Sequence, residues 1–270
     1  MAEFRDQDLS GSTFAHVRLN GSTIEDADLS EMTIRNASMA SADFRGVMFP
    51  DVRMRGVGFR DAEIDGEIEG RLVINGVDVA PLIEAELNRL DPDRALLSPD
   101  DADGFRAAWA MLERRWAALV DRARTLPPEQ LHASVGGEWS FIQTLRHLAF
   151  ATECWLLRAI EGDPRPWQPL SLPWDEAPPT EGVPEDRDAQ PDLDTALALR
   201  LDRATRVRDY MSALTDEELA RMTVPVTEPG WPEPESYLVR DCLLAILREE
   251  WEHRRFAERD LDELAARDDG

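Results

Sequence analysis

The first quarter of the chain carries a repeat of five residues. From the fourth position onward, every fifth residue is large and apolar, thirteen times in succession. A period of five fits neither the 3.6-residue period of a helix nor the two-residue alternation of a strand. It fits a solenoid whose coils have four short sides, in which the central side chain of each side points inward and stacks on the next coil. These residues are Phe4, Leu9, Phe14, Leu19, Ile24, Leu29, Ile34, Met39, Phe44, Phe49, Met54, Phe59 and Ile64.

The repeat resembles the pentapeptide-repeat family over roughly residues 2–68. The resemblance implies a right-handed parallel β-helix, here of about three coils. Since each coil is covered only by its neighbours, the open end of the solenoid needs a cap. We expect this cap in "GRLVINGVDVAPLIEAELNRL", as a strand followed by a short helix. The predicted domains are therefore a β-helix over residues 1–75 and a cap with a linker helix over residues 76–103.

The remaining residues, 104–270, are predicted to form an all-α domain with irregular connections. The segment "GFRAAWAMLERRW" has apolar residues at helical spacing. A second helix is expected to begin at Ser140, where Gln143 stands three residues later as the partner in a capping box. A third helix follows a long break, and a last one is expected from about Tyr237 to Ala266. Four long helices with two long connections predict a four-helix bundle.

A proline-rich segment from Asp163 to Asp192 forms the first of these connections. It contains eight prolines, a density that prevents regular secondary structure. A connection of this length inside a compact domain is usually functional or disordered. Trp167 and Trp174 lie within it. We expect the segment to cover the open side of a site in the bundle, with these two tryptophans as a roof.

Two histidines and one glutamate are the candidate site residues. Glu249 and His253 are one helical turn apart in the last helix, so their side chains share a face. His147 stands in the apolar stretch "LRHLAFA", where an unpaired buried imidazole would cost on the order of 1–3 kcal/mol. If the two helices face each other, two imidazoles and one carboxylate converge and leave an open position, as in catalytic zinc sites.

The residue types leave alternatives open. Glu250 is a possible substitute for Glu249 as a ligand, because it lies three residues before His253. A bundle without metal, in which Glu249 and His253 form a surface ion pair, also accounts for the pattern. The two cysteines, Cys154 and Cys242, are each about two helical turns from a candidate ligand, and we interpret them as small buried residues.

The segments "GGEWSFIQTLRHLAFATECWLLRAI" and "CLLAILREEWEHRRFAERDLDEL" resemble the two signature helices of the DinB/YfiT-like metalloproteins. The resemblance covers roughly residues 104–266 and implies a four-helix bundle that binds a divalent metal. The commonest late-helix pattern, H-x3-H, fails here because Ala257 follows His253. Reading upstream, Glu249 supplies an E-x3-H pair similar to that of mycothiol-dependent maleylpyruvate isomerases. The resemblance therefore implies a zinc ion held by His147, Glu249 and His253.

The same resemblance implies a thiol-dependent transferase or isomerase. Its zinc would bind mycothiol or another low-molecular-weight thiol, and the thiolate would attack a small electrophilic substrate. No catalytic side chain is assigned. The alternative is an interaction protein led by the repeats, either as a scaffold and dimerisation module or as a gyrase-directed mimic of DNA. Residues 1–70 hold fourteen acidic residues and seven arginines, so the sign of their charge suits such a mimic, although three coils are short for one.

The charge and composition restrict the partners and the compartment. The formal net charge is -25, which disfavours nucleic acid and anionic membranes because phosphate groups are bound by cations. Two cysteines do not make a disulfide framework, which favours the reducing cytoplasm. No apolar stretch approaches the ~20 residues of a membrane span, and the first residues lack the pattern of a signal peptide.

Overall fold

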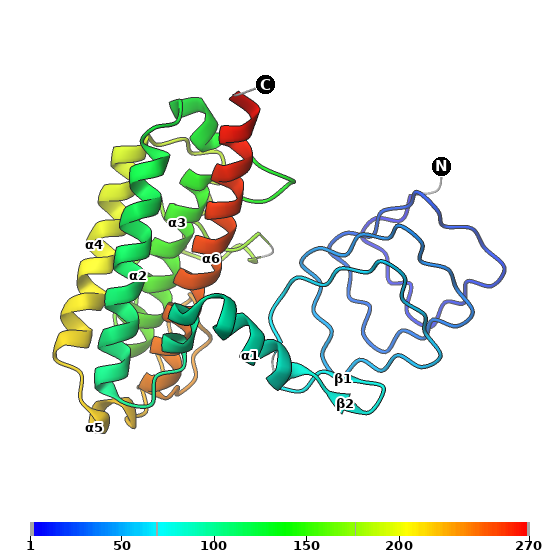
Figure 1. Ribbon diagram of the computed structural model, residues 1–270, viewed down its shortest axis with the longest axis horizontal. Coiled ribbons are helices and arrows are strands. Elements are labelled where there is room, and N and C mark those ends of the chain that lie inside the picture. Colours follow the sequence, from blue (N-terminus) through cyan, green and yellow to red (C-terminus); the bar gives the residue numbers. More distant parts are fainter. Residues whose placement is uncertain (1–2, 69, 176, 269–270) are drawn as a thin grey trace. The chain divides into compact units, whose positions relative to one another are not determined.

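The computed structural model describes residues 3–68, 70–175 and 177–268. The chain divides into two compact units, Met1–Ile64 and Asp65–Gly270, each with its own architecture (Figure 1). Within the described residues, none of the helices combines the length and the apolar character that crossing a membrane requires.

The backbone of the first unit repeats every five residues. Twelve residues, each two positions after an apolar repeat residue, have φ angles between +49° and +73°. Most are glycine, aspartate or asparagine, which tolerate this left-handed region best. From Leu9 to Ala42, every second corner is a hydrogen-bonded turn, as where the N–H of Ser12 donates to the carbonyl of Leu9 at 3.1 Å. The twelve are Asp6, Gly11, His16, Gly21, Asp26, Glu31, Asn36, Ser41, Gly46, Asp51, Gly56 and Asp61.

Two details of the predicted β-helix differ from the structure. The described residues 3–68 contain no strand. The thirteen apolar side chains, expected to point into a core, are exposed, from 38% for Leu9 to 80% for Ile64. The backbone hydrogen bonds described in this unit are turn bonds within a coil. Among residues 3–68, no ladder of bonds therefore draws successive coils to the ~4.8 Å spacing at which their side chains would stack.

The second unit begins with a hairpin and a short helix. Strand β1 (Val73–Ile74) pairs antiparallel with β2 (Val77–Asp78). The two residues between them, Asn75-Gly76, both have positive φ, as a tight hairpin turn requires. Helix α1 (Ala80–Leu90) and the 3-10 segment η1 (Pro92–Leu97) follow. The expected strand and short helix are present, the strand as one arm of a hairpin.

Four long helices form the bundle that makes up the rest of this unit (Figure 1). They are α2 (Ala102–Ala123), α3 (Phe141–Thr152), α4 (Leu193–Ser212) and α6 (Val239–Asp268), with the short segments η2 (Pro128–His132) and α5 (Asp216–Leu219) between them. A π-helical segment, η3 (Glu153–Ile160), continues α3. Their apolar faces, such as that of Phe105, Trp109 and Leu112 on α2, are buried in a shared core. The predicted bundle is confirmed.

Side-chain caps explain where the helices begin. At the start of α2, the Asp101 carboxylate accepts a hydrogen bond from the backbone N–H of Gly104. At the start of α4, the Asp192 carboxylate accepts one from the backbone N–H of Thr195. At the start of α3, Ser140 and Gln143 form the predicted capping box, with each side chain bonded to the other residue's backbone.

Two buried arginines hold the long connections against α3 and η3. Arg146 donates to the carbonyl oxygens of three residues in the proline-rich segment, and Arg158 does the same for the start of that segment and the connection before α6. The acceptors are Leu170 at 2.7 Å, Ala189 at 3.0 Å and Asp186 for Arg146, and Pro164 at 2.8 Å, Val226 at 3.2 Å and Glu228 for Arg158. Burial lowers the pKa of both guanidinium groups. The irregular segments are therefore fixed to the helices by backbone carbonyls.

Candidate metal centre

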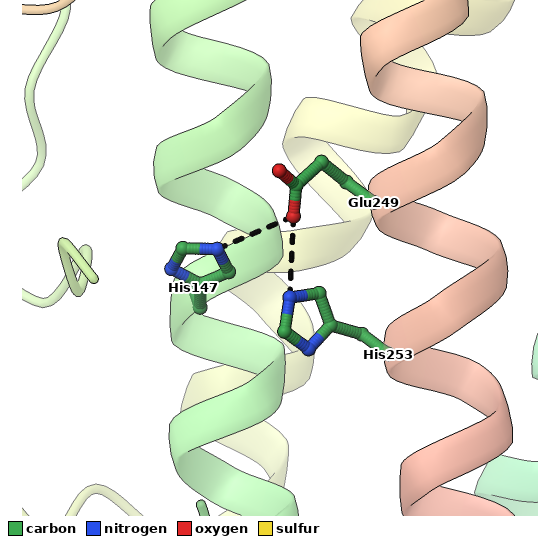
Figure 2. Close-up of side chains that lie close together, drawn as sticks. All are labelled: His147, Glu249 and His253. Carbon is green, nitrogen blue, oxygen red and sulfur yellow. Dashed lines mark ion pairs between the residues drawn. The ribbon is translucent and has the colours of Figure 1, made fainter. Parts of the chain in front are cut away.

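Three side chains from two helices converge inside the bundle. His147 projects from α3, and Glu249 and His253 project from α6 toward it (Figure 2). One ligand atom from each lies within 4.8 Å of the others. In the described part of the chain, this is the one group of three or more histidine, cysteine, aspartate or glutamate side chains close enough to hold a metal ion. The expected convergence of these three residues is therefore observed.

The spacing of the donor atoms suits a small divalent ion. Oε2 of Glu249 lies 3.4 Å from Nε2 of His147 and 3.2 Å from Nε2 of His253. Zinc binds imidazole nitrogen and carboxylate oxygen at about 2.0–2.2 Å, so two donors of a tetrahedral site are about 3.4 Å apart. Both distances from Glu249 match this separation, and the imidazole donors of His147 and His253 lie within 4.8 Å of each other. The residues present thus fit a zinc-like ion with respect to donor type and spacing.

His147 has an acceptor opposite each ring nitrogen. Nδ1 lies 2.9 Å from the carbonyl oxygen of Leu172, and Nε2 faces the Glu249 carboxylate. A neutral imidazole carries one N–H group and cannot donate to both. With that N–H on Nδ1, where the contact is shorter, the lone pair of Nε2 faces an anionic oxygen. A cation bound by both atoms removes this conflict, and a backbone carbonyl on the other nitrogen is the usual partner of a metal-binding histidine.

Glu249 is held as a carboxylate. Burial would raise the pKa of its carboxyl group, but the polar interactions of the carboxylate with the His147 and His253 imidazoles outweigh burial and hold the pKa below its usual range. The side chain keeps 35% of its exposure, so it is partly open to solvent, whereas the His147 side chain keeps 8%. An ionised oxygen donor is what a divalent cation requires at neutral pH.

Aromatic rings surround the imidazoles. The ring of Trp139 lies 4.4 Å from that of His147 and 5.5 Å from that of His253, between ring centroids. Phe150 lies 6.4 Å from His147, one helical turn along α3, and Phe256 lies 6.2 Å from His253. These rings place the polar group in a largely apolar setting, which strengthens electrostatic interactions within it.

The proline-rich segment was expected to cover the open side of the site, whereas the contact that the structure shows is at Nδ1 of His147, the ring nitrogen that does not face Glu249. Its contact with the imidazoles is the carbonyl of Leu172. Trp167 and Trp174 instead pack on Phe150, with centroid distances of 5.2 and 6.3 Å. The two tryptophans therefore extend the aromatic wall beside the site and do not roof the imidazoles.

Glu250 has a separate structural role. Its carboxylate is buried and forms an ion pair with Arg200 of α4. Burial raises the pKa of Glu250, with Arg200 opposing the shift. A parallel buried pair joins Glu153 of η3 to Arg203, at 2.9 and 3.0 Å. These two pairs fix α4 against the helices that carry the candidate ligands, so Glu250 is not placed as a substitute for Glu249.

Both cysteines are buried and free, as expected. Burial raises the pKa of the Cys154 thiol well above its usual value and that of Cys242 to about 12. Neither thiol belongs to the group of three. They fill the core as small, inert side chains.

Sequence reasoning missed two residues that contact the imidazoles, Trp139 and Leu172. Trp139 comes directly before the Ser140 cap, and that position was the available signal, because the residue before an N-cap lies beside the first turn of its helix. Leu172 offers no such signal, since it acts through its backbone carbonyl at a point fixed by the path of an irregular segment.

Comparisons with known proteins place the two parts of the chain in families. Residues 111–257 match the DinB superfamily, and the chain belongs to that superfamily. Residues 24–61 match pentapeptide repeats in eight copies. The fusion of these two parts, expected from the sequence, is confirmed. No curated protein and no solved structure gave a significant match.

Proposed function

We propose that the bundle binds one divalent ion, most simply zinc, through His147, Glu249 and His253. The single observation that carries this proposal is the proton count at His147, which has acceptors opposite both ring nitrogens but only one N–H when neutral. The residues of the group contribute three donors, fewer than the four of a closed structural zinc site. The proposal therefore includes an open position for a small molecule.

We further propose that this small molecule is a low-molecular-weight thiol, mycothiol or a related one, used to attack a small electrophilic substrate. A bound zinc-like ion would supply Lewis acidity that lowers the pKa of the thiol. The chain's own residues orient that centre. Leu172 fixes the N–H of His147 on Nδ1, Glu249 stays ionised, and the aromatic rings limit the access of water.

Metal analysis tests the first part. The purified wild-type protein is expected to hold about one ion per chain, and His147→Ala is expected to lose it. Binding should raise the unfolding free energy by about 3–4 kcal/mol at metal concentrations of 100 to 1,000 times Kd. It should weaken below about pH 6, where imidazoles protonate. A wild-type protein that neither retains nor binds zinc, nickel, iron or cobalt contradicts the proposal.

A cobalt-substituted protein tests the second part. Addition of mycothiol, bacillithiol or glutathione is expected to produce a sulfur-to-cobalt charge-transfer band in the near ultraviolet, because thiolate is a soft ligand that enters the inner shell. If cobalt binds but none of the three thiols gives this band, the thiol proposal is wrong and the metal proposal stands.

The exposed apolar side chains of the repeat unit favour a second, separate function for that unit, as an interaction module. Its thirteen large apolar side chains are 38% exposed or more, and apolar surface of this extent usually marks a contact region. We propose a scaffold or dimerisation role, with the chain as a homodimer. Sedimentation of the whole chain at increasing concentration tests it, and a strictly monomeric protein contradicts it. Gyrase supercoiling assays with and without the protein test the DNA-mimic alternative.

A further inference from the structure

The Trp139 ring packs against both imidazoles, whose own centroids are 4.8 Å apart. Its ring is nearly parallel to that of His253, with an interplanar angle of 11° and a centroid distance of 5.5 Å. It also lies 4.4 Å from the His147 ring, at an angle of 50°. The indole is thus a flat surface against which the His253 ring stacks, while the His147 ring from the other helix packs against it at a tilt.

The proline-rich segment holds this indole in place. Nε1 of Trp139 lies 3.0 Å from both carboxylate oxygens of Asp175, to which it donates. Asp175 in turn pairs with Arg187 at 2.8 Å. Arg187 also donates to the backbone carbonyls of Trp174 and Asp175, at 2.6 and 3.0 Å. The indole is therefore bonded to Asp175, and Arg187 holds Asp175 and the carbonyl of Trp174 in place.

The same short stretch of chain therefore contacts the His147 imidazole directly and reaches the His253 imidazole through Trp139. Leu172 accepts from Nδ1 of His147, and Asp175, three residues later, fixes the ring that lies against His253. The two histidines belong to different helices, α3 and α6. A hydrogen-bond partner such as the Leu172 carbonyl sets the orientation of a metal-binding imidazole, and for His253 the neighbouring group is the indole.

We propose that Trp139 and Asp175 are positioning residues that fix the orientation of the His253 imidazole. Asp175 acts through Trp139: its carboxylate holds the indole N–H, and the indole face holds the imidazole. The effect of this pair on metal affinity rests on the proposed function above. The orientation of the His253 ring does not, so the two can be tested apart.

The metal-free readout is proton NMR of the histidine rings. The chain has four histidines, so single replacements assign their carbon-bound ring protons. In the wild-type apoprotein, the His253 protons should be shifted upfield by the Trp139 ring current. We expect Asp175→Ala to reduce that shift, Asp175→Asn to restore part of it because an amide oxygen still accepts, and Trp139→Leu to abolish it. Unchanged His253 resonances in Asp175→Ala overturn the proposal.

A double-variant comparison separates the proposed chain of contacts from a general loosening of the segment. Trp139→Phe keeps a ring but removes the N–H donor. Adding Asp175→Ala to Trp139→Phe should therefore change the His253 resonances no further. Additive effects of the two substitutions contradict action through the indole. Asp188→Ala, which removes another exposed carboxylate of the same segment, is the control and should leave the His253 shift at its wild-type value.

Metal affinity gives the second readout. If the wild-type protein binds cobalt, Asp175→Ala should weaken binding by about tenfold, the lower end of what loss of an orienting partner usually causes. It should also change the visible spectrum of bound cobalt, since the imidazole moves. An unchanged affinity and spectrum, with cobalt bound in the wild type, overturns the positioning role and leaves the proposed function intact. A wild-type protein that binds no metal overturns the proposed function, and the NMR series then decides the positioning role alone.

Discussion

Leu172 is bonded to Arg146 and His147 of α3 through both its backbone N–H and its backbone carbonyl. Its N–H donates to the carbonyl of Arg146 at 3.2 Å, and its carbonyl accepts from Nδ1 of the next residue, His147, at 2.9 Å. The Arg146 side chain binds the carbonyl of Leu170 in the same segment. Two consecutive helical residues therefore fix the segment, and the segment in turn fixes the tautomer of the histidine.

Removal of the Arg146 guanidinium should release this segment. Arg146→Met leaves the carbonyls of Leu170, Asp186 and Ala189 without their charged donor, and we expect a loss of about 3 kcal/mol or more in unfolding free energy. Limited proteolysis should show cleavage within residues 163–192, and metal affinity should fall about 10–100-fold because Leu172 no longer orients His147.

Arg146→Lys is the matched variant. It keeps the positive charge, but the compact ammonium group lacks the forked guanidinium that binds three carbonyls at once. It should fall between the wild type and Arg146→Met in both measurements. If Arg146→Met is cleaved in the segment yet binds metal as tightly as the wild type, the orientation of His147 does not depend on the segment.

Two neighbouring glutamates should respond in opposite ways to the same substitution. Glu249→Gln removes the ionised donor between the imidazoles, and we expect metal affinity to fall by at least about tenfold with a small change in stability. Glu250→Gln leaves the buried Arg200 without a counter-ion, and we expect a loss of roughly 3–5 kcal/mol with metal stoichiometry unchanged. Chelator competition and urea denaturation measure the two effects.

Removal of both partners provides the control. Arg200→Met in the Glu250→Gln background should regain part of the lost stability, since a buried charge is no longer unpaired. If Glu250→Gln strips the metal and Glu249→Gln does not, the assignment of the ligand on α6 is wrong by one residue.

Glu153 should make the stability of the bundle depend on pH. Burial raises the pKa of its carboxyl group to about 7, in opposition to Arg203. A raised folded-state pKa means that the folded state binds more protons than the unfolded state above about pH 4.5. The contribution is therefore fully present below that pH and is lost as pH rises through about 7, a change of roughly 3 kcal/mol at most.

Denaturation at a series of pH values measures this dependence. Glu153→Gln cannot titrate, so the difference in unfolding free energy between the wild type and this variant isolates the carboxyl group. We expect that difference to change between pH 5 and 8, with the wild type losing stability relative to the variant as pH rises. A difference that is constant over this range contradicts the raised pKa.

The candidate site was predictable where it depends on regular structure. The spacing of Glu249 and His253 places them on one face of any helix, and the apolar neighbours of His147 place it inside the bundle. The Ser140–Gln143 capping box also depends on local sequence alone. Leu172 was not predictable in the same way, because its contact with His147 depends on where the irregular segment from Asp163 to Asp192 passes over α3.

In the repeat unit, the local backbone repeat was predictable from the sequence, but the burial of its side chains was not. Its five-residue period was evident from Phe4 to Ile64, and the φ angles repeat with the same period. Period alone does not fix the distance between coils, however. That distance depends on hydrogen bonds between coils, and the bonds described in this unit lie within single turns. The expected burial of the apolar residues failed at this step.

Ile34 tests the exposure of the repeat residues directly. Its side chain is 55% exposed, and substitution of a surface residue usually changes stability by no more than about 0.5 kcal/mol. We therefore expect Ile34→Asp to leave the unfolding of the repeat unit almost unchanged, as measured by urea denaturation of the whole chain. Ser38→Asp, at an exposed position one residue before Met39, is the control for added charge. A loss of several kcal/mol in Ile34→Asp alone would show that a charge has been buried, and hence that the coils close on this residue in solution.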